Sequence, residues 1–196
     1  MPVLIRRETP ADIPAVTAVT AAAFAKPDTP VPVEVTLLDA LRGCPGWIPA
    51  LSLVATRAVP DGDGATADTD ADSDAAAGAD ATAEVIGHVV CTRGHLDGVP
   101  AVGLGPISVR PDRQNRGVGH ALMHTALGAA DALGEPFVAL LGSPAYYARY
   151  GFRASTAYGI DPPDPAWGAY FQVRTLSTYE PALRGTFTYA EPFSDI

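Results

Sequence analysis

A turn rich in arginine and glycine comes directly before a long predicted helix. Arg110, Arg113 and Arg116 place three of the chain's 13 basic residues in one short stretch, and Gly117 and Gly119 follow at the helix start. Glycine lets an anion approach the backbone because it carries no Cβ. The first turn of a helix has unpaired N–H groups and a partial positive charge, which bind anions. The turn therefore predicts a site for a phosphate-bearing ligand.

Three phosphate-binding patterns can be compared with this turn. A Walker A loop requires Gly-Lys-Ser/Thr, but Gly119 is followed by His120. A dinucleotide-binding fingerprint requires a third glycine at the position that Leu122 occupies. The remaining pattern, Gln/Arg-x-x-Gly-x-Gly/Ala, is matched by Gln114, Gly117 and Gly119.

Further along the chain, a predicted short helix carries three tyrosines, Tyr146, Tyr147 and Tyr150. The serine and proline before them suit the N-cap and the first helical position, and Gly151 suits the helix end. A tyrosine at such a place commonly packs against the core, but its hydroxyl can also donate a proton to a reacting group. The residues alone leave both roles open for Tyr147.

The phosphate-binding pattern, together with Tyr147-x-x-x-Gly151-Phe152 after it, resembles the GCN5-related N-acetyltransferase (GNAT) family. The resemblance covers the chain apart from an acidic loop and is strongest from Leu104 to Arg153. It implies an α/β acyl-CoA N-acyltransferase fold, whose mixed twisted sheet is splayed between the fourth and fifth strands and flanked by helices. It also implies an N-acetyltransferase that uses acetyl-CoA as co-substrate and no metal.

The resemblance assigns roles to individual residues. The implied cofactor-binding residues are Ile107, Ser108, Val109, Gln114, Asn115, Arg116, Gly117, Val118, Gly119 and His120. Backbone groups of Ile107 and Val109 are expected to pair with the pantetheine arm, and N–H groups from Asn115 to His120 to hold the pyrophosphate. Tyr147 matches the family's proton donor to the departing thiolate. Because a thiol with a pKa near 8.5 leaves readily as thiolate, this donor should contribute about 10²-fold to the rate.

The general base is not identified by the sequence. An alkyl amine with a pKa near 10.4 is neutral in only about one molecule in 10³ at pH 7, so the reaction gains from a base. Many relatives use a glutamate on the fourth strand, but the predicted strand Val102–Arg110 contains no acid. His88, His95 and Glu84 are the candidates, and each also suits a packing or surface role. This gap keeps a second hypothesis open, a non-catalytic acyl-CoA-binding sensor or interaction module on the same fold.

The acceptor is expected to attack acetyl-CoA directly. Cys44 and Cys91 lie outside the two motifs, and no Ser/His/Asp set indicates an acyl-enzyme. The acceptor is expected to be a primary amine of a small molecule or a peptide. Five aromatic residues near the C-terminus could line its pocket or belong to the core: Trp167, Tyr170, Phe171, Tyr189 and Phe193.

The net charge of −9 is concentrated in one stretch of the chain. Residues 61–84 hold seven Asp and one Glu without Lys or Arg, which leaves 14 acids and 13 bases, or −1, elsewhere. A nearly neutral body argues against a nucleic-acid partner. The chain lacks a run of 18 apolar residues, so we expect no membrane span. Its first residues lack the order of a secretory signal, which predicts a cytoplasmic protein, and the oligomeric state, a homodimer included, is left open.

The elements that must position these residues fit one N-acetyltransferase domain over residues 1–196. Residues 60–83 consist mainly of Ala, Asp, Gly and Thr, which predicts an acidic, low-complexity, disordered loop within that domain. We expect strands over Val3–Arg7, Leu51–Arg57, Glu84–Arg93, Val102–Arg110, Phe137–Leu141, Ala169–Leu176 and Thr186–Tyr189. We expect helices after a Thr9 cap, over Glu34–Leu41 and Val118–Leu133, and from Ser143. Gly105 and Pro106 predict a bulge or an opened edge, because proline has no N–H for a ladder.

Overall fold

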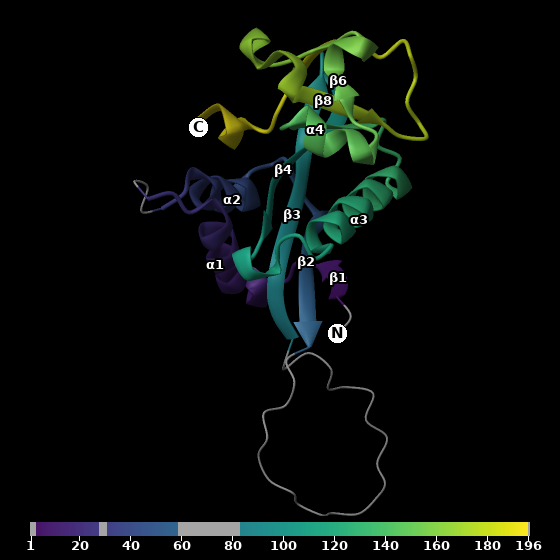
Figure 1. Ribbon diagram of the computed structural model, residues 1–196. Helices are drawn as coiled ribbons and strands as arrows, with labels where there is room; N and C mark the ends of the chain where they lie inside the picture. Colours follow the sequence, from purple (N-terminus) through teal and green to yellow (C-terminus); the bar gives the residue numbers. More distant parts are fainter. Residues whose placement is uncertain (1–2, 28–30, 59–82, 196) are drawn as a thin grey trace, which may run out of the picture.

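The computed structural model describes residues 3–27, 31–58 and 83–195 (Figure 1). The predicted acidic loop 60–83 lies outside these residues except for Ala83, so its disorder stays a prediction. None of the helices formed by the described residues is long and apolar enough to cross a membrane.

A nine-stranded mixed sheet forms the centre of the described structure. Its strands are β1 (Val3–Arg7), β2 (Trp47–Ala58), β3 (Ala83–Leu96), β4 (Val99–Val109), β5 (Phe137–Leu141), β6 (Arg153–Ala154), β7 (Ile160–Asp161), β8 (Phe171–Thr175) and β9 (Gly185–Thr188). The main path runs β1-β2-β3-β4-β5-β8-β6, and β9 pairs with β3 and β7. Neighbours on this path are antiparallel except β4 and β5, which are parallel. The predicted mixed α/β sheet is confirmed.

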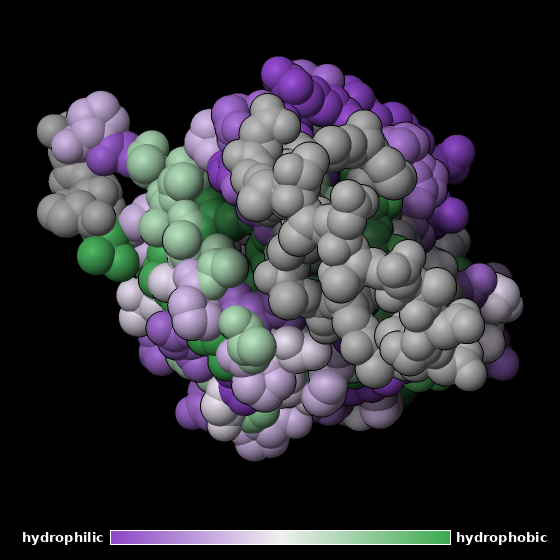
Figure 2. Space-filling model, turned by 90° about the horizontal axis from the view of Figure 1, so that it is seen from below, coloured by the Kyte–Doolittle hydropathy of each residue, from purple (hydrophilic) through white to green (hydrophobic). Residues whose placement is uncertain are grey.

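Helices cover both faces of the long strands (Figure 1). They are α1 (Ile13–Phe24), α2 (Val33–Gly43), α3 (Val118–Ala132) and α4 (Pro144–Tyr147). Side chains alternate along β3, so Val90 packs beneath α1 and α2, whereas Val89 and Cys91 pack beneath α3. Seen from the end where β2 stops and β3 begins, polar and apolar residues are interspersed over the visible surface (Figure 2).

Helix α3 shows why its sequence folds as predicted and where the prediction fails. Its buried residues are Val118, Leu122, Met123, Ala126, Leu127 and Ala130, which recur at helical spacing. Gly134 follows with a φ of 76°, the left-handed conformation that commonly ends a helix. The predicted helix end at Leu133 is one residue too far, because the helix ends at Ala132, and the Leu133 side chain is 51% exposed.

Strands β4 and β5 separate after a very short ladder. They pair only at Val102–Val138 and Gly103–Ala139. Immediately afterwards the β3–β4 register shifts, because two residues of β4 between Leu104 and Ile107 oppose a single residue of β3. The predicted bulge and the predicted splaying of the sheet between its fourth and fifth strands are both confirmed.

Several element bounds differ from the predictions. Strands β2 and β3 extend beyond Leu51–Arg57 and Glu84–Arg93, and the two-residue strands β6 and β7 were not predicted. Strand β8 begins two residues later than predicted, because Ala169 belongs to a 3-10 helix, Pro165–Tyr170. The carboxylate of Asp164 caps that helix by accepting the Ala166 N–H at 2.8 Å.

Candidate active site

The turn between β4 and α3 has a backbone shape suited to an anion. Asn115 has a φ of 58° and Gly117 a φ of 84°, so two residues in close succession are left-handed. The Gln114 amide donates to the Val109 carbonyl at 3.1 Å, which ties the turn to the end of β4. The intrahelical ladder of α3 starts at Ala121, whose N–H donates to the Gly117 carbonyl at 2.9 Å. Earlier N–H groups of this turn therefore lack helical acceptors and are available to a ligand.

A cleft of about 610 Å³ opens beside this turn, and we call it the donor cleft. Eight residues predicted from the sequence line it: Ile107, Val109, Gln114, Asn115, Gly117, Gly119, His120 and Tyr147. The sequence did not predict that Tyr146, Arg149 and Tyr150 also line it. The spacing of Tyr146 and Tyr150 in the short helix was the sequence signal that could have placed them beside Tyr147. Arg149 is held in the cleft by a cation–π contact with the Tyr146 ring, 4.9 Å from its centroid.

Three predicted residues do not line the donor cleft. The Ser108 side chain is buried on the opposite face of β4, where its Oγ lies 3.1 Å from Oγ1 of Thr20. Val118 is 3% exposed and packs in the core beneath α3. Arg116 is exposed and makes no ion pair with a described residue. Ser108 and Val118 can therefore make the predicted contacts with the cofactor only through their backbone groups. Arg116 can do so only if its exposed side chain extends toward the cleft.

Carboxylates neutralise the other two arginines of the turn. Arg110 forms ion pairs with Glu84 and with Asp112, and Asp112 also lies 3.3 Å from Nε of Arg113. The hydrogen bonds from Arg110 hold the pKa of Asp112 below its ordinary value. The cluster of three arginines read from the sequence is therefore less basic than its composition suggests, and Arg116 is the arginine of the three without such a partner among the described residues.

Tyr147 lies half-buried between aromatic neighbours. Its ring centroid is 4.9 Å from that of Tyr146 and 5.8 Å from that of Phe152. Burial, with a smaller effect of Tyr146, raises the pKa of Tyr147 to about 12. The phenol is therefore protonated at neutral pH and can donate a hydrogen bond.

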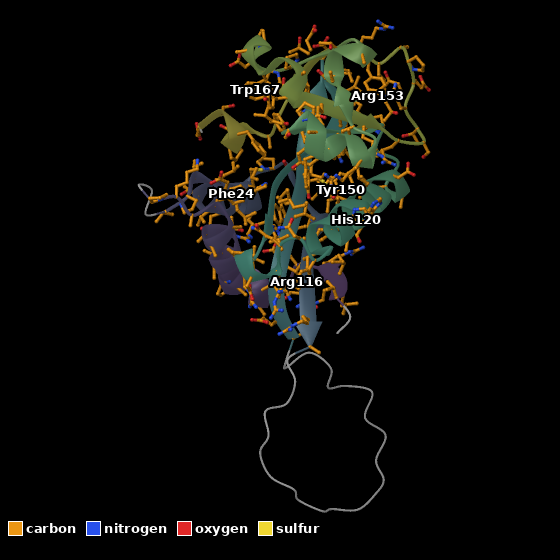
Figure 3. All side chains as sticks on the ribbon, in the orientation of Figure 1. Phe24, Arg116, His120, Tyr150, Arg153 and Trp167 are labelled. Atoms are coloured by element: carbon orange, nitrogen blue, oxygen red, sulfur yellow. The ribbon has the colours of Figure 1, made fainter. Side chains whose placement is uncertain are left out.

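A second cleft, of about 720 Å³, lies on the other side of the split, and we call it the acceptor-side cleft. It is lined by Phe24, Val33, Glu34, Leu37, Leu104, Gly105, Pro106, Ile107, Leu141, Tyr147, Pro163, Asp164, Trp167, Thr188, Tyr189, Phe193 and Ser194. Ile107 and Tyr147 line both clefts. Figure 3 shows Phe24 and Trp167 on one side of β4, with His120 and Tyr150 on the other.

The C-terminal aromatic residues divide between this cleft and the core. Trp167, Tyr189 and Phe193 line the acceptor-side cleft, so the predicted pocket role has a place in the structure. Phe171 is fully buried in the core, and Tyr170 is 59% exposed outside the cleft.

None of the three candidate bases lines either cleft. His88 is completely buried, with Nε2 at 2.9 Å from Oγ of Ser52 and 3.2 Å from Oε2 of Glu8. Burial lowers the pKa of His88, so it is neutral at pH 7. His95 pairs with Thr188 in the sheet. Strand periodicity shows that two residues share a face, but not which face meets the reacting atoms.

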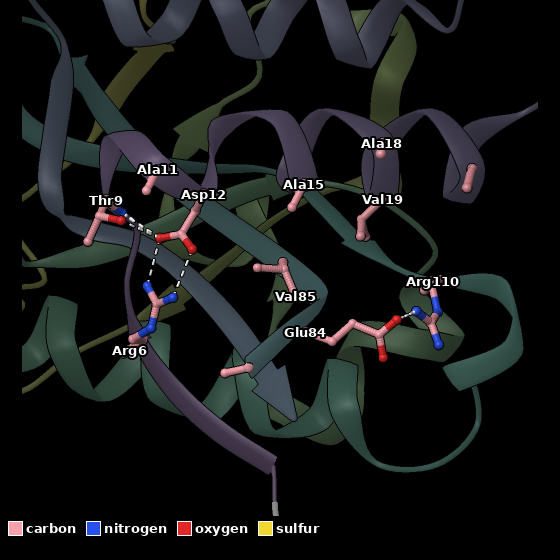
Figure 4. A pocket seen from close by; sticks show the side chains of 12 residues that line it. Arg6, Thr9, Ala11, Asp12, Ala15, Ala18, Val19, Glu84, Val85 and Arg110 are labelled. Carbon is pink, nitrogen blue, oxygen red and sulfur yellow. Dashed lines mark hydrogen bonds and ion pairs between the residues drawn. The ribbon is translucent and has the colours of Figure 1, made fainter. Parts of the chain in front are cut away.

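Glu84, the remaining candidate base, lies in a hollow of about 510 Å³ between α1 and β3 (Figure 4). There it pairs with Arg110, while Asp12 pairs with Arg6 at 2.6 Å. The Arg6 hydrogen bonds outweigh burial and lower the pKa of Asp12 to about 2. The charges that line this hollow therefore compensate one another.

Comparison with known proteins gives a consistent result. A family model described as an acetyltransferase (GNAT) domain matches residues 71–155. The uncharacterized N-acetyltransferase YhbS of Escherichia coli is 29% identical over 104 residues, which are 52% of this chain and 61% of the relative. The alignment thus spans less than two thirds of that relative's length.

Solved structures are similar over nearly the whole chain. The crystal structure of Escherichia coli YhbS in complex with CoA has a TM-score of 0.77 at 26% identity, covering 98% of this chain and 92% of that one. The crystal structure of a GNAT family acetyltransferase from Brucella melitensis in complex with acetyl-CoA has a TM-score of 0.67 at 28% identity, covering 98% of both chains.

Proposed function

Because this chain belongs to the GCN5-related N-acetyltransferase family, we propose that it transfers an acetyl group from acetyl-CoA to the primary amine of an acceptor by direct attack. One observation carries the proposal. Of the residues that the structure describes, Ile107 and Tyr147 alone line both the donor cleft and the acceptor-side cleft, at the point where β4 leaves β5. Two reactants that enter from opposite sides of the sheet would meet at those residues.

The donor cleft suits the parts of acetyl-CoA. The pyrophosphate would lie at the left-handed turn and the start of α3, where N–H groups lack helical acceptors. Beyond Gly103, β4 no longer pairs with β5. The backbone groups of Ile107 and Val109 that face the split are therefore free to pair with the amides of a pantetheine arm.

Tyr147 would assist the departing thiolate through a hydrogen bond more than through complete proton transfer. Its pKa of about 12 lies roughly 3.5 units above that of an alkyl thiol, so moving the proton onto the thiolate is unfavourable by about 5 kcal/mol. As the amine nitrogen bonds to the carbonyl carbon and the C–S bond breaks, the Tyr147 hydroxyl stabilises the negative charge on sulfur. The surplus proton comes from the attacking nitrogen and leaves to solvent.

A second function is favoured by the absence of a carboxylate from the donor cleft and from β4. Without a base beside the reacting carbon, the same fold could bind acyl-CoA as a sensor or an interaction module. Steady release of CoA with any amine excludes a sensor that does not catalyse.

Thermal unfolding tests donor binding. A ligand at 100 times its Kd stabilises a protein by about 2.7 kcal/mol, which raises the Tm of a domain of this size by roughly 5–10 °C. We expect this shift with millimolar acetyl-CoA. Gly117→Ala should reduce it, because alanine is strained at a φ of 84°, whereas Gly128→Ala on the exposed face of α3 should not. An unchanged Tm with acetyl-CoA would count against the proposal.

A further inference from the structure

We propose that the acceptor-side cleft selects a small monoamine with an aromatic or branched aliphatic body, whose ammonium group is attracted by Glu34 and Asp164. The inference rests on the proposed acetyl transfer and names the class of acceptor for that reaction. It follows from the lining of the cleft, its charge and its size, and it excludes both polyamines and amino acids as preferred substrates.

The apolar lining indicates the body of the acceptor. Trp167 is half-exposed and packs with its ring centroid 6.1 Å from Phe171 and 6.3 Å from Tyr189. Val33 and Leu141 are 46% and 47% exposed although both line the cleft. A bound apolar group would remove these surfaces from water, which is favourable in proportion to the area covered. An acceptor without such a group would leave them solvated.

The charge of the lining indicates the other end of the acceptor. Glu34 and Asp164 line the cleft, and the described residues around it include no Lys, Arg or His. Glu34 stands in the first turn of α2, and its carboxylate has no hydrogen bond or ion pair with any residue that the structure describes. Asp164 uses Oδ1 to cap its own turn. Two carboxylates without a cationic partner attract an ammonium group and repel an acceptor that carries its own carboxylate.

The volume limits the size of the acceptor. At about 720 Å³ the cleft falls within the range of small-molecule sites. It shares Ile107 and Tyr147 with the donor cleft. An amine attached to one ring by a short chain would place its nitrogen near that junction while the ring contacts Trp167. A polyamine would bring several charges into a mainly apolar lining and bury no ring.

A panel of three matched amines tests the class. 2-Phenylethylamine combines the ring and the amine, ethylamine lacks the ring, and phenylalanine adds a carboxylate. With acetyl-CoA saturating, we expect kcat/KM for 2-phenylethylamine to exceed that of either other amine by about tenfold or more. Free CoA should be measured by chromatography, because the partly exposed thiol of Cys44 would react with thiol reagents. Equal rates with ethylamine or with phenylalanine would overturn the inference, as would acetylation of peptides alone.

Substitutions separate the ring contact from the charge. Trp167→Ala should raise KM for 2-phenylethylamine about tenfold and leave KM for ethylamine unchanged. Glu34→Gln and Asp164→Asn retain shape, and asparagine can still cap, so each should raise KM about threefold to fivefold with kcat unchanged. Glu180→Gln removes an equal charge from an exposed position outside both clefts and serves as the control. Loss of kcat without a change in KM would contradict the assigned roles.

Fluorescence distinguishes failure of this inference from failure of the proposed transfer. The chain has two tryptophans, so Trp47→Phe leaves Trp167 as the only tryptophan, whose emission can be excited selectively over that of the tyrosines. Titration with 2-phenylethylamine should change its emission, and titration with ethylamine should not. If acetyl-CoA gives no thermal shift but Trp167 responds, the proposed transfer fails while the apolar amine site stands. If acetyl-CoA binds and Trp167 does not respond, the apolar amine site is wrong.

Discussion

Gly142 controls the position of Tyr147 through space alone. A Cβ on Gly142 would lie 2.2 Å from Cε2 of the Tyr147 ring and 2.9 Å from its Cδ2. Since ordinary contacts begin near 3.4 Å, the ring would have to retreat by at least about 1.2 Å. The Gly142 backbone would not change, because its φ is not left-handed and its hydrogen bonds with Tyr170 and Gln172 use only the N–H and C=O groups. Gly142→Ala therefore displaces the Tyr147 side chain without removing any atom of it.

The expected loss of activity follows from that displacement. A misplacement of about 1 Å at a reacting centre can cost about 10²-fold, so Gly142→Ala should lower kcat to nearly the level of Tyr147→Phe. KM for acetyl-CoA should change much less, because ten other residues also line the donor cleft. Overpacking should also lower stability by about 1–3 kcal/mol, which urea unfolding would measure.

A control and a double variant make this prediction specific. Gly128→Ala adds a methyl group where nothing lies within 4 Å, and it should retain full activity with slightly higher stability. If Gly142 acts through the Tyr147 hydroxyl, the Gly142→Ala/Tyr147→Phe double variant should be no slower than Tyr147→Phe alone. A Gly142→Ala protein with unchanged kcat would refute the reasoning, and so would additive losses in the double variant.

Three further predictions concern stability and charge. Burial raises the pKa of Glu8, but the hydrogen bonds from His88 and Ser52 and the charge of Arg42 outweigh burial and lower that pKa to about 2. The ionised Glu8 carboxylate should therefore stabilise the folded protein by about 3 kcal/mol above pH 4.5. Because the folded protein stabilises only the ionised carboxylate, protonation of Glu8 removes this stabilisation as the pH falls from 4.5 to 2, and urea unfolding at several pH values should show the loss. Glu8→Gln should abolish this change of the unfolding free energy with pH. Gly103→Ala should lower the free energy of unfolding by about 1–3 kcal/mol, since its Cβ would lie 2.5 Å from the Tyr189 ring. Arg116→Ala should weaken acetyl-CoA binding and reduce its salt dependence without changing Tm in the absence of ligand.

The sequence predicted the elements whose signals are local and failed where distant contacts decide. Strand β5 was predicted at its observed bounds because a short apolar run between turn residues identifies a buried strand. Strands β6 and β7 have two residues each and form by pairing with β8 and β9, so no local pattern reveals them. The helix predicted to end at Leu133 ends one residue earlier, at Ala132.

The residues of one cleft could be predicted from local sequence spacing, and those of the other could not. The donor cleft comes from two short stretches of chain, Ile107–His120 and Tyr146–Tyr150, so most of its residues could be named from spacing. The acceptor-side cleft joins α1, α2, β4 and the C-terminal turns, and nothing in the spacing connects Glu34 with Asp164 or Trp167. His88 was predicted as a candidate base, but it lines neither cleft. It lies on β3 and faces the side of the sheet beneath α1, where Glu8 and Ser52 hold it away from both clefts.

The sharing of Ile107 and Tyr147 has a kinetic consequence that distinguishes an enzyme from a binding protein. If the clefts hold different substrates, changes at Gly117 should alter KM for acetyl-CoA alone, and changes at Trp167 should alter KM for the amine alone. Changes at Tyr147, which touches both clefts, should alter kcat. A sensor has no reason for this division, because a second cleft that meets the first at Tyr147 adds nothing to the affinity for acyl-CoA. If KM for acetyl-CoA and KM for the amine change independently, this result therefore distinguishes an enzyme from a binding protein most directly.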